Sequence, residues 1–122
     1  MAFKPPLIYF MKKINRLLDN KEFTSVLNKG KKAKVDGYLV AVKSNKEGHA
    51  RIGISVSKKV GKAVVRVRVR RQIRAMIARF DVLSKHIDVV IIPKTSFLQN
   101  SFEQNLSNLK EALNKLLDGS VK

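Results

Sequence analysis

Arg51 to Phe80, RIGISVSKKVGKAVVRVRVRRQIRAMIARF, is the stretch from which the fold is predicted. It begins as an alternating strand, turns at Gly61 and continues into a segment rich in arginine. Its central part, Lys58 to Arg79, contains nine cations and no carboxylate, which is more than half of the formal net charge of +17. Such a concentration of positive charge indicates a polyanionic partner.

Two secondary structures compete for the arginine-rich part. Locally, VVRVRVRR alternates as a half-buried strand does. A strand would have to break near Arg70-Arg71, whereas a helix accounts for the whole segment, so we predict a helix. Val67 would then be a lone apolar residue in the middle of the arginine face. The apolar stripe of this helix, with three- and four-residue steps, is Val65, Val69, Ile73, Met76, Ile77 and Phe80.

The composition limits the class of protein. A chain of 122 residues with 44% hydrophobic residues is long enough for one domain with one core. A pI near 10.6 makes nucleic acid the expected partner, with an anionic membrane surface as the weaker alternative. The chain has no cysteine, so disulfides and thiolate metal sites are excluded. The longest apolar run has five residues, too few for a spanning helix or a signal peptide, and we expect a cytoplasmic protein.

The chain before the basic helix is predicted to contain an arm, a helix and two strands. Residues 1–14 are interpreted as an N-terminal arm or extension, and residues 15–119 as a single domain. A first helix is expected within 15–30, followed by a basic loop containing Lys29, Lys31, Lys32 and Lys34. Strands are predicted at 38–43 and 50–57, paired as a hairpin through the turn SNKEGH.

The chain after the basic helix is predicted to contain a buried strand and a closing helix. The apolar run at 86–93 follows the second strand through a helix, and it can therefore pair with that strand in parallel as a β-α-β unit. A helix is expected at 101–117, where Ser101 and Gln104 form a capping box. The resulting order α-β-β-α-β-α predicts a two-layer α+β sandwich.

The sequence contains no recognisable catalytic or metal-binding motif. His49 and His86 are expected at a turn and at a strand end, where surface roles are far commoner than catalysis. The spacings of zinc-protease and phosphate-loop motifs are absent. We therefore assign no catalytic residue and no metal ligand, and expect any catalysis to belong to a partner.

The segment ISVSKKVGKAVVRVRVRRQIR resembles the signature of the bacterial ribonuclease P protein subunit. In that family a strand ending in S-x-K-K leads through glycine to R-N-R-x-K/R-R-x-x-R. The first helix, with Glu22-Phe23 and Gly30, and the strand VVIIPK also match, so the resemblance covers roughly residues 15 to 117. It implies three helices and a four-stranded sheet in the order α-β-β-β-α-β-α, with a fourth strand near Lys34 to Asp36. It also implies a left-handed β-α-β crossover, against the usual right-handed rule.

The resemblance further implies a function. The chain would be the protein subunit of a ribonucleoprotein endonuclease in which the RNA, with Mg²⁺ bound mainly by RNA, removes the 5′ leader from precursor tRNA. Its partners would be ribonuclease P RNA and precursor tRNA, with neither a membrane nor a small-molecule substrate. The residues matching the catalytic-RNA surface are Lys58, Lys59, Lys62, Arg66, Arg68, Arg70, Arg71 and Arg74. The residues matching the leader-binding site are Phe23, Leu27, Leu39, Ala41, Arg51 and Ser55.

The sequence departs from the family pattern at three positions. Val67 replaces the asparagine of the arginine motif, while Leu27 and Ala41 stand where relatives often have aromatic residues. We expect weaker stacking of the leader and a greater reliance on charge. The alternative function is a ribosomal or generic RNA-binding protein without a catalytic partner.

Overall fold

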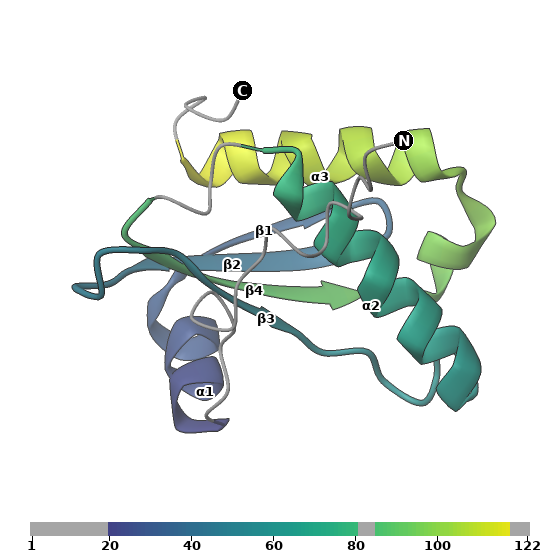
Figure 1. Cartoon of the computed structure of the whole chain (residues 1–122), viewed down its shortest axis with the longest axis horizontal. Helices are drawn as coiled ribbons and strands as arrows, with labels where there is room; N and C mark the ends of the chain where they lie inside the picture. The colour runs from purple at the N-terminus through teal and green to yellow at the C-terminus, as the bar shows by residue number, and fades with distance from the viewer. Residues whose placement is uncertain (1–19, 81–84, 118–122) are drawn as a thin grey trace, which may run out of the picture.

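The described part of the chain is a mixed α+β fold. The computed structural model describes residues 20–80 and 85–117. These residues contain three α-helices and a four-stranded sheet in the order α-β-β-β-α-β-α, which confirms the predicted class (Figure 1). The predicted arm at 1–14 and the first residues of the predicted first helix lie outside the described ranges. The elements are α1 (Asn20–Lys29), β1 (Lys31–Val35), β2 (Tyr38–Ser44), β3 (Arg51–Ile54), α2 (Ala63–Ala78), β4 (Ile87–Pro93), the short 3-10 helix η3 (Thr95–Gln99) and α3 (Phe102–Leu116).

The strand order in the sheet is β1-β2-β4-β3. The β3–β4 pair is parallel and is joined through α2, which confirms the predicted β-α-β unit. The hand of this crossover remains an expectation from the resemblance. The predicted hairpin between 38–43 and 50–57 is wrong, because β4 lies between β2 and β3 and pairs with both. The reason is burial: β4 is almost wholly buried and, apart from Asp88, apolar on both faces, so it takes a central position, whereas β3 has four residues and lies at an edge.

The hairpin in this fold joins β1 and β2 instead. Val35 pairs with Tyr38, so Asp36-Gly37 forms a two-residue turn, and Gly37 has the positive φ of 87° that such turns require. The basic loop predicted at 29–34 is therefore wrong from Lys31 onward, where the chain is a strand. The resemblance correctly implied a fourth strand in this region.

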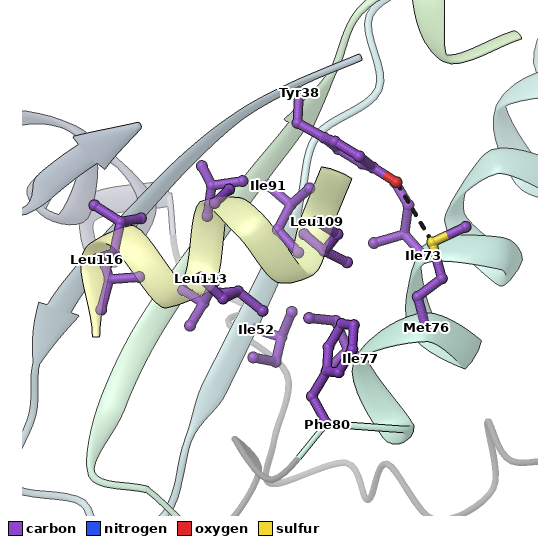
Figure 2. Packing of buried hydrophobic residues seen from close by; sticks show 14 of the residues in the cluster. Tyr38, Ile52, Ile73, Met76, Ile77, Phe80, Ile91, Leu109, Leu113 and Leu116 are labelled. Carbon is purple, nitrogen blue, oxygen red and sulfur yellow. Dashed lines mark hydrogen bonds between the residues drawn. The ribbon is translucent and has the colours of Figure 1, made fainter. Parts of the chain in front are cut away.

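The main core lies between one face of the sheet and the helices α2 and α3. Val69, Ile73, Met76 and Ile77 of α2 are buried there, which confirms the apolar stripe predicted for the basic helix. Figure 2 shows side chains of α2 and α3 meeting those of the sheet in this core. Helix α3 begins after its N-cap Ser101, whose Oγ accepts a hydrogen bond from Gln104 N at 3.1 Å. Only this half of the capping box forms, because the Gln104 side chain donates to Asn108 Oδ1 instead.

Helix α1 packs on the opposite face of the sheet (Figure 1). Val26 forms a small buried cluster there with Ala41 of β2 and Val90 of β4. The helix ends at Gly30, where an added Cβ would lie 2.6 Å from the carbonyl oxygens of both Val26 and Val42. A glycine is therefore required for the chain to pass from α1 directly into β1. No helix within the described ranges has the length and apolar character needed to cross a membrane.

Burial of the Tyr38 hydroxyl should make the core less stable at alkaline pH. Its hydroxyl is buried, 3.1 Å from the carbonyl oxygen of Asn105 and 3.4 Å from Met76 Sδ (Figure 2). This burial raises the pKa of Tyr38 above its ordinary value. The neutral phenol is favoured in the folded state, so its contribution is complete below about pH 10, the unfolded pKa, and is lost as the pH rises beyond it.

We expect the free energy of unfolding to fall as the pH rises above about 10, and to fall less in Tyr38→Phe. At pH 8 the variant should lose about 1 kcal/mol, the usual contribution of one hydrogen bond. Urea unfolding of both proteins across this pH range measures the difference in their free energies of unfolding. Contributions from the other ionisable groups are common to both proteins and cancel in this difference. Parallel curves for the two proteins would contradict this assignment.

Candidate nucleic-acid interface

The side of α2 opposite the core carries a continuous set of cations. Arg68 and Arg71 are exposed, and Arg66, Arg70 and Arg74 are half-buried. The turn that leads into α2 adds exposed Lys58, Lys59 and Lys62. All eight residues predicted to contact the catalytic RNA therefore lie on one helix or on the loop that enters it. Guanidinium groups in such an array can bind successive phosphates with paired hydrogen bonds.

The N-terminus of α2 is unfavourable for an isolated helix. Its N-cap Lys62 provides no side-chain hydrogen bond, and the first turn contains no acidic residue. Cations near the positive end of a helix dipole are destabilising, and uncapped N–H groups are left without a partner from the cap. A bound phosphate would correct both defects. This end of α2 is therefore suited to an anion.

Two exposed valines interrupt the cationic surface. Val67 is 45% exposed, as expected for a residue on the arginine face, and Val64, one turn earlier, is 72% exposed. Together with Ala63, Arg68 and Arg71 they line a shallow hollow. The exposure of Val67 was predicted but that of Val64 was not, although the offset of Val64 from the apolar stripe already placed it outside the core.

The residues predicted to bind the leader lie around the sheet face that α1 partly covers. Phe23 and Leu27 of α1 and Leu39 of β2 are half-buried, while Ser55, just after β3, is exposed. Phe23 and Leu27 pack against the small cluster below α1, as does Ile92 of β4. Ala41 has no exposed surface, so a direct contact with RNA would require α1 to move away from it.

Arg51 is held in place by carboxylates rather than left free for a phosphate. Its Nε and Nη2 donate to the two carboxylate oxygens of Asp88, each at 2.8 Å, and its Nη1 forms an ion pair with Glu22 of α1. The hydrogen bonding that Arg51 donates to Asp88 is the largest cause that raises the pKa of Arg51, so the guanidinium stays charged. Arg51 thus joins α1, β3 and β4.

Asp88 is the buried centre of this network. It is 5% exposed and also accepts a hydrogen bond from Asn45 Nδ2 at 2.7 Å. Asp88 was not among the predicted site residues. The signal was present, because an aspartate inside an apolar strand requires a buried partner, but the sequence could not identify Arg51, 37 residues away, as that partner.

The histidines and acidic residues do not assemble a catalytic centre within the described ranges. His86 is exposed, and the Nδ1 of half-buried His49 lies 3.2 Å from the carbonyl oxygen of Ala50. No group of three or more histidine, aspartate or glutamate residues in residues 20–80 and 85–117 is placed to hold a metal ion.

Comparisons with known proteins agree with this geometry. The sequence pattern of the Ribonuclease P family matches residues 11–117. The ribonuclease P protein component of Mesoplasma florum is 37% identical over 109 residues, covering 88% of this chain and 96% of that protein. The chain belongs to the ribonuclease P protein family. The resemblance noted in the sequence is thereby confirmed.

Solved structures of ribonuclease P proteins have the same fold. A mutant RNase P protein of Staphylococcus aureus matches with a TM-score of 0.77 at 29% identity, covering 87% of this chain and 91% of that one. The RNase P protein of Thermotoga maritima matches with a TM-score of 0.69 at 29% identity, covering 83% and 94%. The α-β-β-β-α-β-α order of this chain thus matches the fold of these proteins.

Proposed function

We propose that this chain is the protein subunit of ribonuclease P and supports removal of the 5′ leader from precursor tRNA by a catalytic RNA. The observation that carries the proposal is the outward cationic face of α2, whose exposed and half-buried arginines lie in the segment that resembles the family signature. In this proposal α2 and Lys58, Lys59 and Lys62 contact the ribonuclease P RNA. The α1 side of the sheet contacts the single-stranded leader.

In this proposal the protein contributes binding and positioning rather than bond cleavage. Cations on α2 neutralise RNA backbone charge, which lets two polyanions approach each other. The half-buried ring of Phe23 offers a surface on which a leader base can stack. We assign the catalytic ions to RNA phosphates and the site of action to the cytoplasm.

Reconstitution with a catalytic RNA tests the proposed function. The chain is mixed with a bacterial ribonuclease P RNA at low Mg²⁺, and cleavage of a precursor tRNA with a 5′ leader is followed against RNA alone. We expect a large stimulation of cleavage at the leader junction. Binding of many RNAs with similar affinity and no stimulation would instead support a generic RNA-binding protein.

Val67→Asn is expected to tighten binding of the ribonuclease P RNA. Asparagine would restore polar hydrogen-bonding capacity at an exposed position of the cationic face. One added hydrogen bond of about 1 kcal/mol corresponds to about fivefold in affinity. The two residues have similar helix propensities, so the stability of α2 should change little.

A side-by-side titration of the wild-type chain and Val67→Asn with the catalytic RNA measures this effect. Val64→Asn is the matched control, because it makes the same change on the same helix outside the arginine motif. Equal affinities for wild type and Val67→Asn would exclude a polar contact at this position.

A further inference from the structure

The edge strand β1 carries lysines that the proposed function leaves unused. Ala33 and Val35 pack against the main core, so the alternation of the strand directs Lys32 and Lys34 to the α1 side of the sheet. Both lysines are exposed. Neither side chain forms an ion pair or hydrogen bond with any residue in 20–80 or 85–117. We call these two residues the β1 lysine strip.

The pairing of the strands connects this strip to the predicted leader site. Lys34 pairs with Leu39, and Leu39 pairs in turn with Ile92. Ile54 pairs with Ile91, and Ser55 N donates to Ile91 O at 3.0 Å, so Ser55 lies next in line with Ile92. Lys34, Leu39, Ile92 and Ser55 therefore form a row across all four strands of the sheet, which we call the cross-sheet row.

The two ends of the cross-sheet row are both basic. Ser55 is followed by Lys58 and Lys59, which lead to the cationic face of α2. The other end is Lys34, with Lys32 beside it. Between them lie half-buried Leu39 and Ile92, and Ile92 packs against the same small cluster as Phe23 and Leu27 of α1. Apolar surface flanked by cations suits a single-stranded nucleic acid, because its bases can stack on the apolar surface and its phosphates can pair with the cations.

Helix α1 leaves the strip uncovered. It contacts β2 and β4 on this face, and its last turn passes through Gly30 directly into β1. The nearest carboxylate along the chain, Asp36, accepts a hydrogen bond from Asn100 Nδ2 at 3.2 Å. Nothing within the described ranges thus neutralises Lys32 or Lys34.

We propose that the β1 lysine strip is a second phosphate-binding site, which holds the part of a single-stranded RNA leader farthest from α2. This inference rests on the proposed function and extends it to the edge of the sheet. Crossing three strand spacings takes about 14 Å. At the 3.4 Å per nucleotide of a stacked strand this is about four nucleotides. A leader must therefore exceed about four nucleotides beyond Ser55 before the strip can contribute.

The test variant is Lys32→Ala/Lys34→Ala, and the matched control is Lys46→Ala/Lys110→Ala. The control removes the same charge from two exposed lysines, in the β2–β3 connection and on α3. In a first experiment, the free chain is titrated with single-stranded uridine oligomers of three and eight nucleotides at several salt concentrations. Loss of two phosphate contacts should weaken binding of the longer oligomer about tenfold and lower its salt slope by about 1.4.

The first experiment decides between the strip and general electrostatics. The test variant should keep its affinity for the shorter oligomer, and the control should keep most of its affinity for both. The proposal would be overturned if the test and control variants lost the same affinity. It would also be overturned if the test variant lost the same affinity for the shorter and the longer oligomer. A duplex RNA of eight base pairs bound as tightly as the single strand would overturn it as well.

The second experiment uses the holoenzyme and precursor tRNAs with leaders of two and eight nucleotides. We expect the test variant to weaken binding of only the substrate with the longer leader. If the wild-type chain does not stimulate the catalytic RNA, the proposed function fails, while the oligomer titration still decides whether the strip binds single strands. An unchanged holoenzyme affinity for the longer leader would overturn the role of the strip in the complex.

Discussion

Replacing Arg66 and Arg68 together with alanine is expected to remove most of the stimulation that this chain gives to a ribonuclease P RNA. Two charge-assisted contacts of about 1.5 kcal/mol each correspond to about a hundredfold in affinity. The slope of log affinity against log salt should fall by about 2, close to one per phosphate contact. The double variant thus tests the assignment of α2 as the surface that contacts the catalytic RNA.

The fold should survive this double substitution. Alanine has a higher helix propensity than arginine, and removal of cations near the uncapped N-terminus of α2 relieves an unfavourable interaction with the helix dipole. Unfolding in urea should therefore match that of wild type. Lys46→Ala/Lys110→Ala, with the same charge removed elsewhere, should retain stimulation. A double arginine variant that keeps both its stimulation and its salt slope would place the RNA surface away from this part of α2.

Asp88→Asn is expected to cost about 2 kcal/mol of stability. Removing one partner of a fully buried ion pair costs about 3–5 kcal/mol. The value here is lower because the Arg51 side chain retains 21% exposure and also contacts Glu22. Since Arg51 joins α1 to the sheet, the loss should be largest for α1. Urea unfolding measures the total, and hydrogen exchange of the α1 amides measures the local part.

Glu47→Gln is the control for this substitution. Glu47 Oε1 lies 4.0 Å from Arg51 Nη1, and the Glu47 side chain is 53% exposed. Removing its charge should therefore lower the free energy of unfolding by less than about 0.5 kcal/mol. Arg51→Gln should lower stability with Asp88 intact, and the combination with Asp88→Asn should cost less than the sum of the two single changes. Additive losses would mean that Arg51 and Asp88 do not act as a pair.

Local pattern was sufficient to predict the helices and the central strand. The stripe from Val65 to Phe80 repeats at the helical period, and it is buried as that period requires. Ser101 stands before the first turn of α3 and caps it. Likewise, 86–93 is apolar enough to be buried on both faces, which made β4 recognisable as a strand. In these segments the side chains that are buried are those that the local pattern of apolar residues predicts.

One strand and one strand pairing were predicted wrongly, because their signals are weak or absent in the local sequence. β1 has lysine at three of its five positions and reads as a solvated loop, although Ala33 and Val35 alternate toward the core. The connection after β2 has turn residues, which favoured a hairpin with β3. Its Asn45 instead donates to Asp88 and to the carbonyl oxygen of His49, in a loop that passes around the end of β4.

The sequence by itself determined that this protein has a basic helix, an apolar core and the signature of the ribonuclease P family. These properties depend on the spacing of residues close together in the chain. Only the tertiary structure decided that β4 separates β2 from β3, that Asp88 and Glu22 hold Arg51, and that Lys34 lies in one row with Ser55. Each is a contact between residues far apart in the chain. Such contacts are selected by the burial of complete sheet faces and by the pairing of buried charges, and no local spacing encodes them.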